Sequence, residues 1–268
     1  MNRSESATLG RAPLRLLIPA GLALVLLLAP LTALVSRAPW ASLPERLVAP
    51  EVLDALRLSI LTATVASVLC LLLGLPLAWL LARVEFRGAS LVRALVAVPL
   101  VLPPVVAGVA LLAAFGRNGV LGGPLRDCCG VSIPFTTAAV VLAQTFVALP
   151  FVVISIEGAL RAIDRQYDDV AAVLGADRWT IFRRVSVPIA LPGIMAGLVL
   201  GWARALGEFG ATITFAGNYP GTTQTMPLAV YTALQADPDA AVVLSLILLV
   251  VSIAVLALLR ERWLGGAR

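Results

Sequence analysis

Six long apolar runs follow one another along the chain, separated by short polar segments. Each run approaches the ~20 residues with which an α-helix crosses about 30 Å of hydrocarbon. Uncharged runs of this length are typical of transmembrane helices. The pattern therefore predicts an all-α, polytopic membrane protein, a single transmembrane domain over 1–268, with six transmembrane helices at residues 16–36, 58–82, 94–116, 133–156, 187–203 and 240–259.

The first run needs a separate decision, because an N-terminal apolar segment resembles a signal peptide. Its apolar core is longer than the 7–15 residues of a signal-peptide core. No small-residue cleavage site follows it. We therefore interpret residues 16–36 as an uncleaved transmembrane helix.

Arginine placement predicts the orientation of the chain. If the N-terminus is cytoplasmic, fourteen arginines fall in cytoplasmic segments and five in the outer loops, with Arg204 inside a span. Loops rich in Lys or Arg stay on the cytoplasmic side, so both termini are expected to be cytoplasmic. This bias also accounts for the net charge of +5, and no nucleic-acid partner is needed to explain it.

Composition excludes several classes of chemistry. Hydrophobic residues make up 60% of the chain and charged residues 13%, about half the charged share of a soluble domain. Histidine is absent, which removes the commonest neutral-pH base and metal ligand. Cys70, Cys128 and Cys129 form neither a CxxC motif nor a set with ligand spacing. We expect no metal site, no cofactor and no enzymatic activity in this chain.

Prolines and glycines mark special positions in the spans. Pro76, Pro99 and Pro150 are expected to kink their helices, as is the adjacent pair Pro103 and Pro104 in the third span. The pair suits a pathway that opens between helices, although proline is also simply common in membrane helices. Gly193, Gly197 and Gly201 recur every four residues and allow another backbone to approach. That neighbour is a helix of the same subunit, a second subunit or the pore.

The cytoplasmic segment 158–187 is longer than the other loops. Apolar residues recur in it at helical spacing from Leu160 to Leu174. Gly175 fits the left-handed position after a helix, and Asp177 fits the N-cap of a second helix that begins at Arg178 and has Arg183 on its polar side. This pattern alone is equally typical of a docking element for a cytoplasmic partner and of a helix pair in the lipid headgroups.

The same segment resembles the import permeases of binding-protein-dependent ABC transporters, which carry the pattern E-A-A-x3-G-x9-I-x-L-P in this loop. Here the pattern is Asp169-Val170-Ala171, three residues, Gly175, nine residues and Val185-Ser186-Val187-Pro188, with mild departures at four positions. The resemblance implies an ABC importer permease-like fold in which this loop seats on a cytoplasmic ATPase subunit. The coupling residues that it implies are Asp169, Ala171, Ala172, Gly175, Ala176, Arg178, Arg183 and Pro188.

The partners follow from the same resemblance. The sequence contains no GxxxxGK(S/T) phosphate loop, so ATP hydrolysis is expected in two separate ATPase subunits. The implied importer also contains a second copy of this chain, surrounding membrane lipid and an extracytoplasmic substrate-binding protein. Its location is the bacterial cytoplasmic (inner) membrane, and its mechanism is alternating access.

Residues 204–241, which include the run FAGNYPGTTQTMPLAVY, are similar to the molybdate transport permeases. This similarity implies molybdate as the imported oxyanion and a molybdate-binding protein as the extracytoplasmic partner. Tungstate and sulfate or thiosulfate remain alternatives, because their permeases share the GEFGA portion. A stand-alone secondary transporter is the alternative from another class, although the sequence shows no internal repeat.

Candidate pore or gate residues are Pro103, Pro104, Arg204, Glu208 and Thr212. Charges inside a membrane are costly and are usually paired or functional. Arg204 and Glu208 are four residues apart, which favours a mutual pair that acts as a clasp or a gate. Direct contact between Arg204 and the oxyanion is a further alternative.

Overall fold

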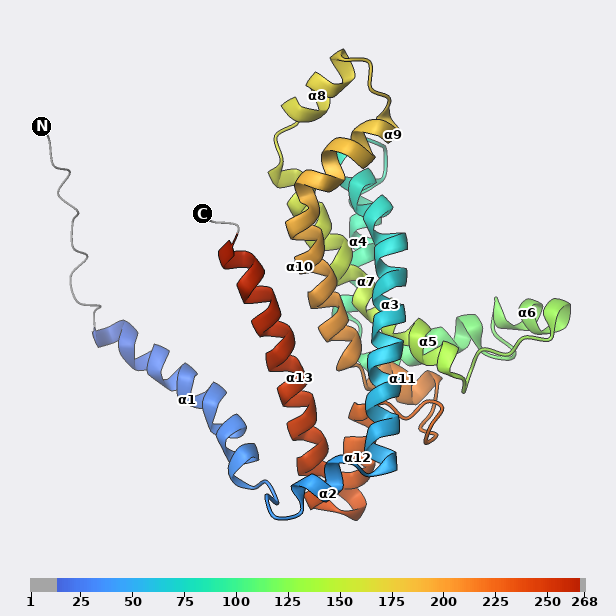
Figure 1. The fold of residues 1–268 in the computed structure, drawn as a ribbon. Helices are drawn as coiled ribbons and strands as arrows, with labels where there is room; N and C mark the ends of the chain where they lie inside the picture. The colour runs from blue at the N-terminus through green and yellow to red at the C-terminus, as the bar shows by residue number, and fades with distance from the viewer. Residues whose placement is uncertain (1–13, 266–268) are drawn as a thin grey trace, which may run out of the picture.

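The computed structural model describes residues 14–265, in which every regular element is a helix. Three long helices, α3, α7 and α10, run side by side through the centre, and α13 lies beside them (Figure 1). Helix α1 leans away from this bundle, and its spanning window is not buried by the rest of the chain. The elements are α1 Leu14–Ser36, α2 Leu43–Leu47, α3 Pro50–Arg83, α4 Ala89–Val101, α5 Pro104–Phe115, α6 Gly122–Cys129, α7 Thr137–Ala162, α8 Gln166–Val173, α9 Arg178–Ile181, the π-helix η1 Phe182–Ser186, α10 Val187–Leu206, α11 Gly210–Phe215, α12 Met226–Ala236 and α13 Pro238–Gly265.

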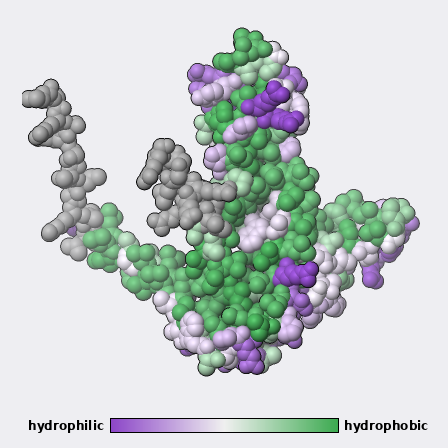
Figure 2. All heavy atoms as spheres, in the orientation of Figure 1, coloured by the Kyte–Doolittle hydropathy of each residue, from purple (hydrophilic) through white to green (hydrophobic). Residues whose placement is uncertain are grey.

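The spanning helices agree with the predicted membrane architecture. Within residues 14–265, five helices are long and apolar enough to span a membrane, and the bent pair α4–α5 is a sixth if it is counted as one span. Figure 2 shows a broad apolar band over the middle of the molecule, with polar residues gathered toward its two ends. The chain is therefore an all-α, multi-pass membrane protein, as predicted.

The orientation also agrees with the arrangement of the ends. The C-terminal end of α13 points toward the same end of the bundle as α8 and the end of α3 (Figure 1). We refer to this end as cytoplasmic, from the arginine distribution. Arg3, Arg11 and Arg268, three of the arginines behind that orientation, lie outside the described residues.

The main core lies between α3, α7 and α10. Small residues on α3 face α7, so that the two helices approach closely along most of their lengths. A second core joins α5, α7 and α11, and a third joins α3, α12 and α13. The buried residues of the main core are Ala63, Ala66, Cys70, Ala78, Leu81, Ala82, Ala148, Val152, Val153, Ile156, Leu160, Ala190, Ile194, Ala205 and Leu206.

The glycine stripe of α10 packs against α7 in the same chain. A Cβ atom added at Gly197 would lie 2.8 Å from the Cβ atom of Ser155. Added Cβ atoms at Gly193 and Gly201 would overlap side chains of α7 in the same way. Of the three neighbours considered for this stripe, a helix of the same subunit is therefore the one observed.

The third span differs from the single kinked helix predicted for residues 94–116. It consists of α4 and α5, whose axes meet at 117°. Leu102 and Pro103 are extended, with ψ values of 128° and 135°, and they separate the two helices. Two successive prolines remove two backbone donors, and each disfavours helical geometry in the residue before it. Pro76, Pro99 and Pro150 lie inside continuous helices.

The stretches 37–57, 117–132 and 212–239, which lie between the predicted spans, also form helices. They contain α2, α6 and α12, together with most of α11. Helix α3 also begins at Pro50, eight residues before the predicted span. Its first turns carry charged residues, which hydropathy assigns to a loop even though proline at the first position is a favoured helix start.

Candidate functional site

Residues 158–187, which we call the coupling segment after the role predicted for them, contain two helices joined at a glycine. Helix α8 ends at Val173, and Gly175 has a φ of +87°, the left-handed conformation predicted for it. The N–H of Gly175 donates to Ala172 O, and that of Ala176 donates to Ala171 O. These bonds satisfy carbonyl groups at the end of α8, as a glycine C′ position does.

Asp177 caps the second helix, as predicted. Its Oδ1 atom accepts a hydrogen bond from the Thr180 N–H at 3.0 Å. Hydrogen bonds from Thr180, first from its side chain and then from its backbone, hold the pKa of Asp177 below its ordinary value. The charged carboxylate therefore also interacts favourably with the N-terminus of α9.

Two details of this segment differ from the prediction. Leu160 belongs to α7 and is fully buried in the main core, and Ile163 is the residue that ends α7. The apolar periodicity from Leu160 therefore spans the end of a membrane helix and a separate helix α8. The second helix is also not isolated, because α9 continues through η1 into α10 as a 29-residue run over Arg178–Leu206.

Helices α8 and α9 expose several large apolar side chains. Tyr167, Val170, Val173, Leu174 and Trp179 are all exposed, with Val173 at 87% and Leu174 at 82%. We call these five side chains the α8–α9 patch. Helix α8 lies at the far cytoplasmic end of the molecule, beyond the ends of the spanning helices (Figure 1). Four of the five side chains lie on α8 or directly after it, outside the membrane-spanning helices, whereas Trp179 also lines a pocket against α3. An exposed apolar patch at α8 is typical of a protein interface.

The predicted coupling residues lie around this patch. The structure brings them together on α8, on the turn at Gly175 and on the helical run that follows. Ala171 and Ala176 are half-buried, whereas the others are exposed and available to a partner: Asp169, Ala172, Gly175, Arg178, Arg183 and Pro188.

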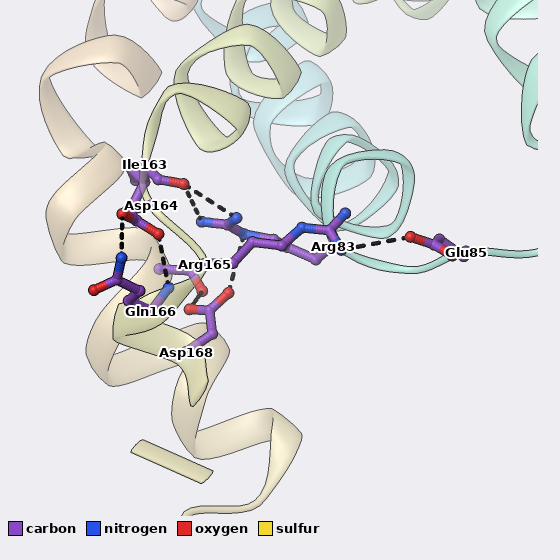
Figure 3. Close-up of polar contacts among 8 residues, drawn as sticks. Arg83, Glu85, Ile163, Asp164, Arg165, Gln166 and Asp168 are labelled. Atoms are coloured by element: carbon purple, nitrogen blue, oxygen red, sulfur yellow. Dashed lines mark hydrogen bonds and ion pairs between the residues drawn. The ribbon is translucent and has the colours of Figure 1, made fainter. Parts of the chain in front are cut away.

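The opposite side of α8 is held by an ion pair that the sequence did not reveal. Arg83, the last residue of α3, places its Nε atom 3.0 Å from Asp168 Oδ2 (Figure 3). The Nη1 and Nη2 atoms of Arg83 each donate to Ile163 O at 3.3 Å. Ser186 Oγ donates to the second oxygen of Asp168, Oδ1, at 3.2 Å. Arg83 and Asp168 are 85 residues apart, so spacing carries no signal for this contact.

A cavity of about 360 Å³ lies beneath α8. Its lining includes Arg83 and Asp168 together with Trp79, Asp169 and Ile181. The space between α8 and the end of α3 is therefore not filled by packed side chains.

A second buried carboxylate holds the cytoplasmic ends of α3, α4 and α7 together. Glu157 Oε1 lies 2.7 Å from Arg93 Nε and 2.9 Å from Arg161 Nη2. Arg93 Nη2 also donates to Leu81 O at 2.6 Å. These contacts join the cytoplasmic ends of three spanning helices, next to the coupling segment.

The predicted pair in the membrane is formed. Arg204 Nη1 lies 2.7 Å from Glu208 Oε2, and the Glu208 side chain is only 1% exposed. Glu208 Oε1 accepts a hydrogen bond from the Ala211 N–H at 2.9 Å. Both oxygens of the carboxylate are therefore used, one toward α10 and the other at the start of α11.

The remaining pore candidates lie close to this pair. A Cβ atom added at Gly210 would lie 2.6 Å from Pro104 Cβ, so α11 begins directly against the break between α4 and α5. Thr212 is fully buried, and its hydroxyl has no partner among the described residues. The structure thus gathers Pro104, Glu208 and Thr212 where α5 and α11 meet.

Sequence reasoning missed two features near this meeting point. Gly108 allows α5 to contact α11, since an added Cβ atom would lie 2.5 Å from Thr214 Cβ. Gln144 on α7 is fully buried, and neither end of its amide has a partner among the described residues. A lone glutamine inside an apolar run was the available signal for the second feature.

Comparison with known proteins identifies the class of this chain. Residues 74–265 match the model of the family described as "Binding-protein-dependent transport system inner membrane component". The matched range holds the coupling segment, the Arg204–Glu208 pair and every spanning helix after α3. The chain belongs to this family, and it is a multi-pass inner-membrane protein.

Curated relatives of this chain include molybdenum transport permeases. Over 235 residues the chain is 51% identical to the molybdenum transport system permease protein ModB of Mycobacterium tuberculosis, covering 88% of this chain and 89% of that protein. It is 40% identical over 212 residues to the ModB protein of Escherichia coli K12, and this match covers 79% of this chain and 93% of that protein.

A solved structure shares the fold. It is that of a bacterial alginate ABC transporter in complex with an alginate-pentasaccharide-bound periplasmic protein. The TM-score is 0.69 at 19% identity, over 92% of each chain. This likeness shows the ABC importer permease fold that the sequence resemblance implied.

Proposed function

We propose that this chain is the permease subunit of an ABC importer that carries molybdate into the cytoplasm by alternating access. The observation that carries the proposal is the 51% identity to a molybdenum transport permease over 235 residues. The matched length includes both the coupling segment and the region after Glu208. Tungstate and sulfate or thiosulfate are the alternative cargoes.

The α8–α9 patch supports a separate ATPase as the source of energy. Its exposed apolar side chains, with Asp169 and Arg178 beside them, suit a groove on a cytoplasmic protein better than water. The sequence has no phosphate loop of its own. We infer that two ATPase subunits bind two copies of this chain and that catalysis takes place in those subunits.

A second copy would cover apolar surface that one chain leaves open. Val101 is 85% exposed beside the break between α4 and α5, and Val105, Val106 and Val109 on α5 are exposed as well. We propose that these helices face the second copy and the passage, and that lipid covers α1. The outer helices α2, α6 and α12 would receive an extracytoplasmic molybdate-binding protein, which would supply most of the specificity.

We propose that the Arg204–Glu208 pair acts as a clasp between α10 and α11. Glu208 already neutralises Arg204, and both of its oxygens are occupied. A neutralised pair is a weak binding site for a dianion, so the geometry favours a clasp over direct contact with molybdate. Opening the passage next to Pro104 would then involve moving α11 against α5.

Uptake of labelled molybdate into proteoliposomes tests the proposal. The vesicles contain the permease, its ATPase and its binding protein, and ATP is enclosed on the ATPase side. We expect uptake that requires ATP and that excess tungstate reduces more strongly than sulfate does. Uptake driven by an ion gradient without the ATPase would instead support a secondary transporter. ATP-dependent uptake of sulfate but not molybdate would contradict the cargo and leave the class intact.

A further inference from the structure

The carboxylate of Asp168 joins the coupling helix to two membrane helices. Asp168 lies in the first turn of α8, on the side that faces the bundle, and its side chain is 18% exposed. Its neighbour Asp169 is more exposed, and it lines the same cavity beneath α8. Asp168 Oδ2 contacts Arg83 at the end of α3, and Oδ1 accepts from Ser186, the last residue of η1 before α10.

Both anchors of this carboxylate are held firmly. The Arg83 side chain is 6% exposed, and its Nη1 and Nη2 atoms each donate a hydrogen bond to Ile163 O. Ser186 is fully buried. Its position depends on the π-helix, a form that often appears as a local irregularity at functional sites. A displacement of Asp168 is therefore resisted at the ends of α3 and α10.

The backbone on either side of α8 is not helical, so it transmits a displacement of α8 to the membrane helices poorly. Before α8, the helical geometry of α7 ends at Ile163, which is extended. After α8, Gly175 is left-handed and Asp177 is extended, so the helix is interrupted again. The helix is therefore connected to the ends of α3 and α10 through side chains, those of Asp168, Arg83 and Ser186.

We propose that Asp168 is a positioning residue that transmits movement of the docked coupling helix to α3 and α10, through Arg83 and Ser186. This inference rests on the proposed function, because it assumes that an ATPase moves α8. The physical requirement is an element with two arrangements that both sites bias. The cavity beneath α8 provides the space for the second arrangement.

A nearby ion pair offers a matched control. Arg165 Nη1 lies 3.5 Å from Glu85 Oε1, and it connects nearly the same two segments, as Figure 3 shows. Both side chains are well exposed, at 61% and 88%. Exposed pairs contribute little, so removing this pair should leave coupling unchanged. Asp164 is a second control, since its carboxylate oxygens accept only from Gln166 in the contacts that the described residues make.

The experiment measures ATP hydrolysis and oxyanion uptake in the same proteoliposomes, with the complete complex. The variants are Asp168→Asn, Arg83→Gln, their combination, Ser186→Ala and the control Glu85→Gln. Asp168→Asn should keep hydrolysis near the wild-type rate and lower the uptake per ATP by about 2- to 30-fold. The loss in the double variant should be clearly smaller than the sum of the two single losses, because both changes break the contact between Arg83 and Asp168. Glu85→Gln should keep the wild-type ratio of uptake to ATP hydrolysis.

Several outcomes would overturn the inference. One is an unchanged ratio of uptake to ATP hydrolysis in Asp168→Asn, and another is additive losses of this ratio in the double variant. A third is an equal fall of hydrolysis and uptake, which would indicate an assembly defect alone. If Asp168→Asn does not copurify with the ATPase, Ser186→Ala decides, and an unchanged ratio there counts against the link. A wild-type complex that imports another oxyanion would contradict the proposed cargo only. The ratio is then measured with the oxyanion that the complex imports.

Discussion

Replacing Gly197 by alanine would place a methyl group inside the contact between α10 and α7. The new Cβ atom would lie 2.8 Å from the Cβ atom of Ser155. An ordinary carbon–carbon contact is about 3.5–4.0 Å, so the two helices must separate by roughly 0.7–1.2 Å. Neither atom is at the end of a flexible side chain, and the backbones themselves have to move.

The cost follows from this overlap. Overpacking of a well-packed interior costs about 1–3 kcal/mol. For a chain of this size, that loss lowers the melting temperature by roughly 2–10 °C. Gly158 on α7 is the matched control, since nothing lies within 4 Å of an added Cβ atom there. Gly158→Ala should raise stability by about 0.5–1 kcal/mol, because alanine is the better helix former.

Cys70 provides the assay. It is fully buried, so a maleimide dye reacts with it only on unfolding. The exposed thiols of Cys128 and Cys129 are first replaced by serine to remove the background. Heating the purified protein in detergent then gives a melting curve for each variant. Adding Ser155→Gly to Gly197→Ala should recover part of the loss, because it removes the facing Cβ atom.

Two results would refute this reasoning. Gly197→Ala could melt at or above the wild-type temperature, which would show that the helices separate at no cost. Alternatively, Gly158→Ala could lose as much as Gly197→Ala, which would show that the effect does not come from the contact with α7.

Three further predictions concern other parts of the chain. Arg204→Gln should destabilise the protein by about 3 kcal/mol, since it leaves Glu208 buried without its counter-ion, and adding Glu208→Gln should restore much of the loss in the same melting assay. The hydrogen bond from Arg46 holds the pKa of Asp237 below its ordinary value. That contact therefore stabilises the fold at neutral pH and is lost as the pH falls through the lowered pKa, so the melting temperatures of wild type and Asp237→Asn should converge in acid. Gly175→Val should abolish ATP-dependent uptake while membrane insertion persists, because the φ of +87° at this position excludes a β-branched residue. Gly175→Asn should keep most of the uptake, because asparagine tolerates the left-handed conformation. Full uptake by the valine variant would contradict the assignment of the coupling segment.

Local signals were sufficient for much of this structure. The left-handed Gly175 and the cap at Asp177 depend on neighbouring backbone, so residue type and spacing could predict them. The Arg204–Glu208 pair is likewise set by a separation of four residues. The glycine stripe indicated close packing, but its partner remained open until α7 was seen to face it.

Other features depend on contacts that no local pattern records. The proline pair predicted a kink in the third span, but the break into two helices bent by 117° was not predicted, and it depends on the packing of α5 against α11 at Gly108 and Gly210. Leu160 was assigned to the coupling helix because apolar residues recur at the same helical spacing at the end of α7, which is buried, and in α8, which lies on the surface. The continuity of α9 with α10 was missed as well. Pro188 suggests a helix start, yet a π-turn before it accommodates the missing N–H.

The ion pairs at the cytoplasmic end have a practical consequence for chemistry on this protein. Each of their cations is an arginine, because the chain contains no lysine. Guanidinium groups stay charged at any pH that the protein tolerates, so raising the pH does not neutralise the cations of these contacts. Amine-directed reagents find no side chain to modify. The coupling segment must instead be labelled through engineered cysteines or through reagents selective for arginine.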